Sequence, residues 1–175
     1  MKRLKKQVAV VFCNGGSNAK SGISRAGLDC AQLASQYPDG ILECAYGCLS
    51  GGSCVAACKV SAVRINEANV AEVAREKCIG CGLCVKACPQ GVIHMVLPEN
   101  VIAPQCSNLE PGAAARKQCS RSCIACRICE KNCPAGAIAV VDNRAVIDQE
   151  LCIACGMCAI KCPKGVIVDA DGVLS

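Results

Sequence analysis

The sequence predicts a small α+β fold made of two tandem modules, and three features of the chain lead to this expectation. Its 175 residues include 20 cysteines, one histidine and only three aromatic side chains, so bulky rings cannot fill its interior. The cysteines recur in a repeating pattern, and a repeat has to be recognised before elements are assigned. Between the cysteine runs, stretches typical of β-hairpins alternate with stretches that suit one or two turns of helix.

The repeat is a run of four cysteines with fixed spacing, C-x2-C-x2-C-x3-C-P. A fourth segment, CLSGGSCVAACK, keeps this register, but Gly51 stands where the second cysteine should be and Lys59 replaces the proline. The complete runs are Cys78, Cys81, Cys84, Cys88 and Pro89; Cys123, Cys126, Cys129, Cys133 and Pro134; and Cys152, Cys155, Cys158, Cys162 and Pro163.

Two longer units contain these runs, and their alignment places Cys44 on Cys119 and Cys48 on Cys123. Each unit holds two short strands around a polar turn, VRINEANVAEV in the first and IAVVDNRAVID in the second. LCVKAC and MCAIKC are expected to form short helices that the following proline closes. We therefore expect modules at 44–97 and 119–175, an N-terminal segment at 1–43 that contains Cys13 and Cys30, and an irregular, proline-marked linker at 98–118 that contains Cys106.

The spacing of the cysteines favours metal binding over disulfide bonds, and no secretory signal opens the chain. C-x2-C-x2-C-x3-C-P is the bacterial ferredoxin pattern, in which three thiolates bind one [4Fe–4S] cluster and the fourth binds a second cluster. Structural zinc sites instead pair C-x2-C elements across a longer loop, often with histidine. Buried or disulfide-linked cysteines would not repeat this register. Each module is therefore expected to be a bacterial-type 2[4Fe–4S] ferredoxin-like unit.

The crossover of the fourth cysteine assigns four sites. In the second module, Cys123, Cys126 and Cys129 are expected to bind one cluster with Cys162, and Cys152, Cys155 and Cys158 another with Cys133. In the first module, Cys78, Cys81 and Cys84 with Cys58 form a complete site. Its companion has Cys48, Cys54 and Cys88, and we expect Cys44 to replace the thiolate missing at Gly51; a three-iron cluster or an open site is the alternative.

Four cysteines remain, enough for one further cubane: Cys13, Cys30, Cys106 and Cys119. Cys13 and Cys106 follow similar extended apolar stretches, VAVVFCN and VIAPQCSN. We expect a fifth cluster here. The alternative is that the four are free buried thiols, a role that suits cysteine.

The formal charge of +5 does not indicate nucleic acid binding. Each [4Fe–4S] cluster with four thiolates carries about −2 when oxidised, so five clusters would turn +5 into roughly −5. The chain also lacks the stacking aromatics and helical motifs of nucleic-acid readers. No apolar run approaches the roughly 20 residues of a membrane-spanning helix, so direct membrane insertion is not expected. His94 lies in GVIHMVL, a segment typical of a strand, and is expected to be a packed or surface side chain and not a ligand or proton relay. We identify no catalytic residue or substrate site.

With these motifs in place, the chain resembles the B subunit of the Rnf complex, the membrane-bound ferredoxin:NAD oxidoreductase that couples electron transfer to sodium or proton pumping. The resemblance rests on VVFCNGG, GLDC at Gly27–Cys30, CAYGCLSGGSCVAAC at Cys44–Cys58 and the three ferredoxin runs. In that family an anchor helix and a separate cluster domain precede this region. The chain is therefore expected to be a naturally short relative or the carboxy-terminal polyferredoxin portion.

The resemblance implies electron transfer from reduced ferredoxin, through the clusters, to flavin-bearing partner subunits, in the cytoplasm or on the cytoplasmic face of the membrane. Basic side chains could steer an acidic ferredoxin, although a solvated surface is the alternative. Two other functions are considered. One is a freestanding polyferredoxin of a soluble hydrogenase or 2-oxoacid oxidoreductase, and the other is a structural metal-stabilised interaction module. The basic residues are Lys2, Arg3, Lys5 and Lys6, and Arg116, Lys117, Arg121, Arg127 and Lys131.

Overall fold

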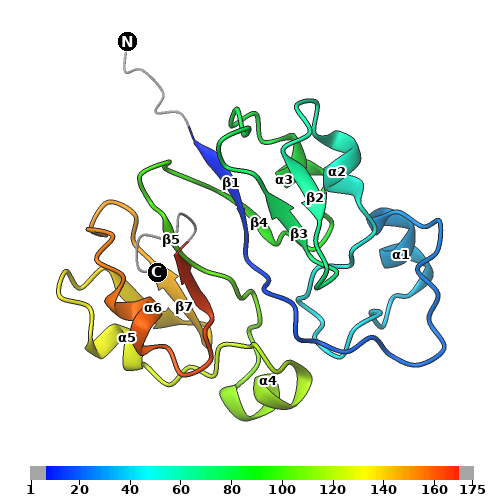
Figure 1. Cartoon of the computed structure of the whole chain (residues 1–175). Coiled ribbons are helices and arrows are strands. Elements are labelled where there is room, and N and C mark those ends of the chain that lie inside the picture. Colours follow the sequence, from blue (N-terminus) through cyan, green and yellow to red (C-terminus); the bar gives the residue numbers. More distant parts are fainter. Residues whose placement is uncertain (1–6, 170–175) are drawn as a thin grey trace.

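A computed structural model describes residues 7–169 and shows a mixed α/β protein of short elements (Figure 1). Its strands form antiparallel pairs that are separate from one another. β1 (Val8–Val11) pairs with β4 (Ile93–Val96), β2 (Val63–Ile65) with β3 (Ala71–Val73), β5 (Ile102–Pro104) with β8 (Ile167–Asp169), and β6 (Ile138–Val141) with β7 (Arg144–Ile147). The helices are α1 (Cys30–Gln36), α2 (Ser53–Ala57), α3 (Leu83–Ala87), α4 (Gly112–Gln118), α5 (Ile128–Lys131) and α6 (Met157–Lys161).

The same order of elements occurs twice along the chain. The first unit runs β1, α2, β2, β3, α3 and β4, and the second runs β5, α5, β6, β7, α6 and β8. Figure 1 shows the two units side by side. The tandem ferredoxin-like fold is confirmed, as are both hairpins and the helices at LCVKAC and MCAIKC.

Two parts of the chain are more regular than the sequence suggested. The linker, expected to be irregular, contains β5 and α4. Pro104 is tolerated because its strand pairs on one side only, and Pro111 immediately precedes α4, where a missing N–H costs no helical hydrogen bond. In the N-terminal segment, β1 joins the first unit: Val8 lies opposite Val96 and Val11 opposite Ile93.

The short helices of the cysteine runs each follow a residue in the left-handed backbone region. Gly52, Gly82 and Gly156 hold this position before α2, α3 and α6, with φ between 71° and 76°. Arg127 holds it before α5 with φ 58°. Helices of four or five residues are not stable by themselves in water, so packing and side-chain ligation must hold them.

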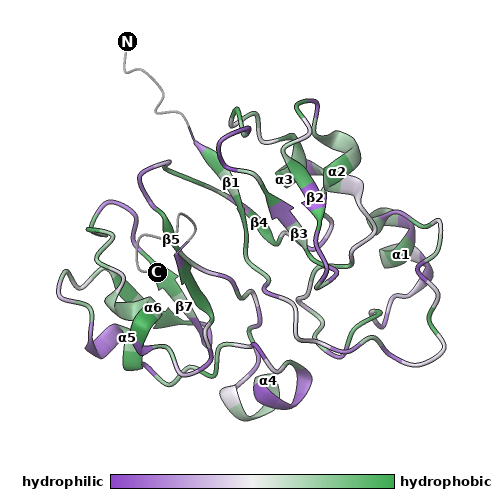
Figure 2. Cartoon of the chain, in the orientation of Figure 1, coloured by the Kyte–Doolittle hydropathy of each residue, from purple (hydrophilic) through white to green (hydrophobic). Residues whose placement is uncertain are grey.

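Small aliphatic side chains and cysteines make up the core. The first unit packs Val8, Val63, Val92 and Ile93 around Cys54 and Cys84, and the second packs Ile138 and Ile167 around Cys129 and Cys158. In Figure 2 the apolar colour is clear on β1 and β4 of the first unit and on β7 and α6 of the second. No helix of the described residues is both long and apolar enough to cross a bilayer.

A third, smaller core lies in the segment between β1 and α2. Leu33 on α1 is fully buried there, with Ile41 and Leu42 beside it. α1 begins with a capping box, because the Asp29 carboxylate accepts from the Gln32 N–H at 2.8 Å and the Gln32 side chain accepts from the Asp29 N–H at 2.9 Å. Such caps typically contribute about 1 kcal/mol, and this one fixes the backbone on either side of Cys30.

Candidate iron–sulfur sites

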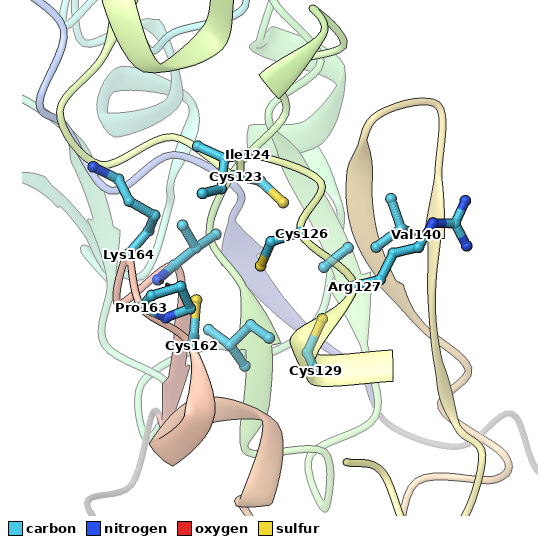
Figure 3. Close-up of a pocket in the computed structure, with 12 residues that line it drawn as sticks. Cys123, Ile124, Cys126, Arg127, Cys129, Val140, Cys162, Pro163 and Lys164 are labelled. Carbon is cyan, nitrogen blue, oxygen red and sulfur yellow. Dashed lines mark hydrogen bonds between the residues drawn. The ribbon is translucent and has the colours of Figure 1, made fainter. Parts of the chain in front are cut away.

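The second module contains a cavity lined by the four cysteines that the crossover rule groups together. In Figure 3 the sulfur atoms of Cys123, Cys126, Cys129 and Cys162 surround a shared space beside Pro163 and Lys164. The space among the lining residues, including the solvent at its mouth, measures about 350 Å³. Burial, followed by the charges of Cys123, Cys126 and Cys162, raises the pKa of Cys129. We call this group site 3.

The other cavity of the second module is lined by Cys133, Cys152, Cys155 and Cys158, which we call site 4. Its space, including the solvent at its mouth, measures about 320 Å³. Burial, as the largest cause, together with the charges of Cys152 and Cys133, raises the pKa of Cys158 to about 11. The two cavities are of similar size, and each takes three cysteines from one run and the fourth from the other. The structure thus brings together both sets that the sequence grouped in this module.

In the first module, Cys78, Cys81 and Cys84 lie together, since the charges of Cys78 and Cys81 add to burial in raising the pKa of Cys84. Cys58 follows α2 at the position that Cys133 occupies after α5. We call these four cysteines site 1. Backbone N–H groups face the Cys58 sulfur: although burial is the largest single effect and raises its pKa, four backbone hydrogen bonds together lower it below the ordinary value. One of them, from Ala62, measures 3.2 Å.

The irregular group of the first module contains Cys30 and not the expected Cys44. Burial raises the pKa of Cys54 to about 12, and the charges of Cys48, Cys30 and Cys88 act on it next. We call these four cysteines site 2. Cys44 instead lies with Cys13, Cys106 and Cys119. The structure therefore exchanges Cys30 and Cys44 relative to the grouping expected from the sequence.

The reason for this exchange is visible at Gly51. A Cβ atom placed on Gly51 would lie 2.5 Å from the Cys30 nitrogen and 2.6 Å from the Asp29 carbonyl carbon. The backbone that carries Cys30 thus occupies the space where a cysteine at position 51 would extend. Cys30 is held there by its own N–H, which donates to the Ser53 Oγ at 2.9 Å.

Sequence reasoning missed Cys30 as a member of site 2, although three signals were present. Asp29 and Gln32 have the spacing of a capping box, which predicts a helix start at Cys30. The glycine at position 51 also leaves room for another segment to approach the backbone. Alignment of Cys44 with Cys119 was the third signal, because it indicates that these two cysteines have equivalent places in the two units.

Sites 1, 3 and 4 reach the surface through the second cysteine of each run, since Cys81, Cys126 and Cys155 are exposed. All four cysteines of site 2 are buried or half-buried. Within the described residues, no three His, Cys, Asp or Glu side chains come close enough to hold a single metal ion. A cubane distributes its four thiolates over separate irons, so its ligands surround a larger space than a single zinc ion requires.

Basic side chains gather around site 3. Arg127 and Lys164 line its cavity, and Arg121 donates to the Asn14 backbone carbonyl at 3.2 Å. Arg127 is paired with Glu130 at 2.9 Å, which offsets part of its charge. The other basic group, Lys2, Arg3, Lys5 and Lys6, lies outside the described residues.

His94 packs in β4 as expected. Its ring stacks on Phe12 with ring centroids 4.2 Å apart. Burial, followed by the charge of Arg144, lowers the pKa of the imidazole, so a neutral, packed ring is favoured.

Comparison with known proteins supports iron–sulfur binding by the segments that contain the cysteine runs. The family described as 4Fe–4S dicluster domain matches residues 45–95, 122–167 and 77–138. Over 151 residues, the chain is 39% identical to the B subunit of the Na(+)-translocating ferredoxin:NAD(+) oxidoreductase complex of Acetobacterium woodii, covering 83% of this chain and 44% of that protein.

Two further relatives share shorter stretches. The B subunit of an ion-translocating oxidoreductase complex of Methanosarcina acetivorans is 40% identical over 52 residues, 30% of this chain and 19% of that protein. A protein of Archaeoglobus profundus that is like the A subunit of heterodisulfide reductase is 39% identical over 66 residues, 38% of this chain and 9% of that protein. The chain thus spans less than half the length of the curated relatives it matches.

The repeated ferredoxin runs, the cysteine-lined cavities and these relatives agree with one another. The chain carries several [4Fe–4S] clusters and acts in electron transfer. It belongs to the 4Fe–4S dicluster proteins and is an iron–sulfur protein of the Rnf B type.

Proposed function

We propose that the chain accepts electrons from reduced ferredoxin and passes them to flavin- and NAD-linked partner subunits of an Rnf-type ion-translocating complex. The observation that carries this proposal is site 3, a four-cysteine cavity that reaches the surface at Cys126 amid basic side chains. The name of the Acetobacterium woodii B subunit supports the choice of donor, and the names of both B subunits support an ion-translocating complex.

Sites 1 to 4 are proposed to hold one [4Fe–4S] cluster each, with four cysteine thiolates as the only side-chain ligands. When bound, such a cluster takes up or releases one electron at low potential. The protein's contribution is to set that potential. Backbone N–H groups of Ala62, Ala137 and Val166 donate to Cys58, Cys133 and Cys162 at 3.2 to 3.4 Å, which favours the more negative, reduced state.

The short helices join the two sites of each module. α2 carries Cys54 of site 2 and ends beside Cys58 of site 1, while α3 carries Cys84 of site 1 and ends beside Cys88 of site 2. In the second module, α6 joins Cys158 of site 4 to Cys162 of site 3 in the same way. One turn of helix therefore links neighbouring sites, which keeps them close enough for electrons to pass between them.

The proposed ferredoxin-docking surface is centred on the exposed Cys126 and on Lys164, which lines the same cavity. We include in it the exposed basic residues near the Cys123–Cys133 run in sequence: Arg116, Lys117, Arg121 and Lys131. Bacterial ferredoxins are typically acidic, so a basic rim would raise the rate of encounter in a manner that salt suppresses. Arg127 contributes less because Glu130 partly neutralises it.

Charge reversal tests the docking surface directly. In a triple variant, Arg121→Glu, Lys131→Glu and Lys164→Glu, reduction by ferredoxin should slow and lose its dependence on salt. Lys86→Glu is the control, because Lys86 is an exposed basic residue on α3 of the first module. Stopped-flow spectroscopy under anaerobic conditions gives both rates. Equal rates and equal salt dependence in the triple variant and the control would rule out docking at site 3.

Copurification tests the proposed partners and location. If the chain works with an Rnf-type complex, flavin-bearing membrane subunits should copurify with it from the cytoplasmic side of the membrane. Recovery of a soluble hydrogenase or 2-oxoacid oxidoreductase instead would replace this assignment with a freestanding polyferredoxin. Clusters that cannot be reduced and reoxidised reversibly would indicate a structural role and remove electron transfer altogether.

A further inference from the structure

We propose that Cys13, Cys44, Cys106 and Cys119 form a fifth [4Fe–4S] site, site 5, which joins the two ferredoxin modules electronically. The proposal rests on the cluster content of sites 1 to 4 proposed above. It concerns a set of cysteines that the dicluster family matches do not group, since Cys13 and Cys44 precede all of them.

The four cysteines come from equivalent places in the two units. Cys13 follows β1 and Cys106 follows β5, the strands that open the units. Cys44 and Cys119 each stand four residues before the first cysteine of a run, Cys48 and Cys123. Each unit therefore supplies one cysteine from each kind of position, and the site lies where the units meet.

Several contacts show that these cysteines converge in the interior. Cys44, Cys106 and Cys119 are buried, with 7–8% of their surface exposed. The Cys119 Sγ lies 3.2 Å from the Gly15 carbonyl oxygen, and Ser17 pairs with Cys119 in an isolated β-bridge. The Ser17 hydroxyl also accepts from the Cys44 N–H at 2.9 Å. One short segment after Cys13 thus holds both Cys44 and Cys119 in place.

Mutual electrostatic effects support the same grouping. Cys119, Cys106 and Cys13 lie near enough for their charges to add to burial, the largest cause, in raising the pKa of Cys44 to about 11. Burial also raises the pKa of Cys119, where Cys13 adds to the effect and Lys164 and Arg121 oppose it. The two basic side chains would offset the charge of about −2 that four thiolates and an oxidised cubane carry together.

Each neighbouring module contacts this group through a backbone hydrogen bond. The N–H of Cys48, which belongs to site 2, donates to the Cys13 Sγ at 3.4 Å. The N–H of Cys123, which belongs to site 3, donates to the Cys106 Sγ at 3.3 Å. The sites then follow one another in the order 1, 2, 5, 3 and 4, with site 5 as the connection between the modules.

The chemistry required of the four residues is simple. Each thiol gives up one proton as it binds iron, because the thiolate is the ligand. Transfer between sites moves one electron from a reduced neighbour and changes no covalent bond. The reductant is the one named in the proposed function.

Iron analysis and electron paramagnetic resonance (EPR) of paired alanine variants test the assignment. Purified anaerobically, the wild-type chain should contain about 20 irons. The double variant Cys44→Ala and Cys106→Ala should contain about 16, because both substitutions fall in site 5 and empty that site alone. The spectra of the other four sites should persist in this double variant. In the matched control, Cys30→Ala with Cys106→Ala, the changes fall in two sites, so the site 2 signal should also be altered.

The outcomes separate this proposal from the proposed function. A wild-type content of about 16 irons, unchanged in Cys44→Ala with Cys106→Ala, would overturn site 5 and leave sites 1 to 4 standing. If the control keeps the site 2 signal and the first double variant loses it, Cys30 and Cys44 have been assigned to the wrong sites. Far fewer than 16 irons in the wild type would contradict the proposed function itself. Slower passage of electrons between the modules in the first double variant would support the connecting role, and an unchanged rate would refute it.

Discussion

Replacement of Gly51 by alanine should remove Cys30 from site 2 without altering any cysteine. The added Cβ would lie 2.5 Å from the Cys30 nitrogen, 2.6 Å from the Asp29 carbonyl carbon and 3.0 Å from the Cys30 Cα. These are backbone atoms, and the closest is nearly an ångström inside ordinary van der Waals contact. Overpacking of this kind typically costs about 1–3 kcal/mol, and a backbone neighbour places this substitution at the upper end.

The chain can relieve this overlap by moving the segment that begins α1 away from α2. Site 2 would then keep three cysteines, Cys48, Cys54 and Cys88, and the chain should lose about one to four irons. Anaerobic iron analysis measures the loss, and EPR detects a three-iron cluster if one forms. The other sites should retain their signals, because the three atoms nearest to the added Cβ belong to Asp29 and Cys30.

Gly52→Ala is the matched control for this experiment. Gly52 has φ 76°, so alanine is strained there by about 1–2 kcal/mol, but no atom lies within 4 Å of the added Cβ. Its iron content should therefore equal that of the wild type. If Gly51→Ala also retains full iron content and an unchanged site 2 signal, Cys30 is not a ligand and the reasoning is wrong.

Three further predictions concern site 5 and the fold. Gly16→Ala should reduce occupancy of site 5, because its Cβ would lie 2.9 Å from the Arg121 nitrogen, whereas Gly22→Ala, which is equally left-handed but meets no atom within 4 Å, should retain full iron content. Asn108→Leu should lower the potential of site 5 in a redox titration by up to about 40 mV. The buried Asn108 amide donates to the Cys44 Sγ at 3.5 Å, and the whole bond is worth on the order of 1 kcal/mol, which sets the upper limit. An unchanged potential would show that this contact has no influence. Removal of iron with a chelator should abolish the circular dichroism of the short helices, because metal binding and folding are coupled; an apo chain with a native spectrum would contradict this.

The contact between Asn108 and Cys44 could not be predicted from the sequence, and the structure shows the reason. Hydrogen bonds hold both ends of the Asn108 amide group. The amide oxygen accepts from the Glu110 N–H at 2.8 Å, and the amide nitrogen donates to Gln118 and to the Cys44 Sγ. Nothing in the local pattern SNLEPG distinguishes this asparagine from an ordinary turn residue. Its role depends on a contact across 64 residues of sequence.

The ferredoxin-like fold and most of the cysteines in the four module sites could be predicted from the spacing of the cysteines. Because three-residue steps and a following proline constrain the backbone locally, the groups of the second module could be assigned from the register alone. The hairpins could be predicted as well, since Asn66 and Asp142 mark turns between short alternating strands. The cysteine register and the hairpin turns both depend on residues that are close to one another in the sequence.

The exchange of Cys30 and Cys44 could not be derived from the register. Position 51 lacks a cysteine, and sequence distance favoured Cys44, four residues before the run, over Cys30, which lies 18 residues before it. The start of α1 at Cys30 lies against Gly51 and Ser53 at the start of α2, which reverses that order in space. Long-range approach of this kind depends on tertiary packing, which a local pattern does not record.

The most direct test of the central claim is anaerobic native mass spectrometry of the intact chain, which counts complete cubanes on single molecules. Five four-cysteine sites predict a dominant species whose added mass corresponds to five [4Fe–4S] cores, with no cysteine left for alkylation. A dominant species with four cores and four alkylated cysteines would contradict the fifth site, and bound zinc in place of iron and sulfide would contradict the account as a whole.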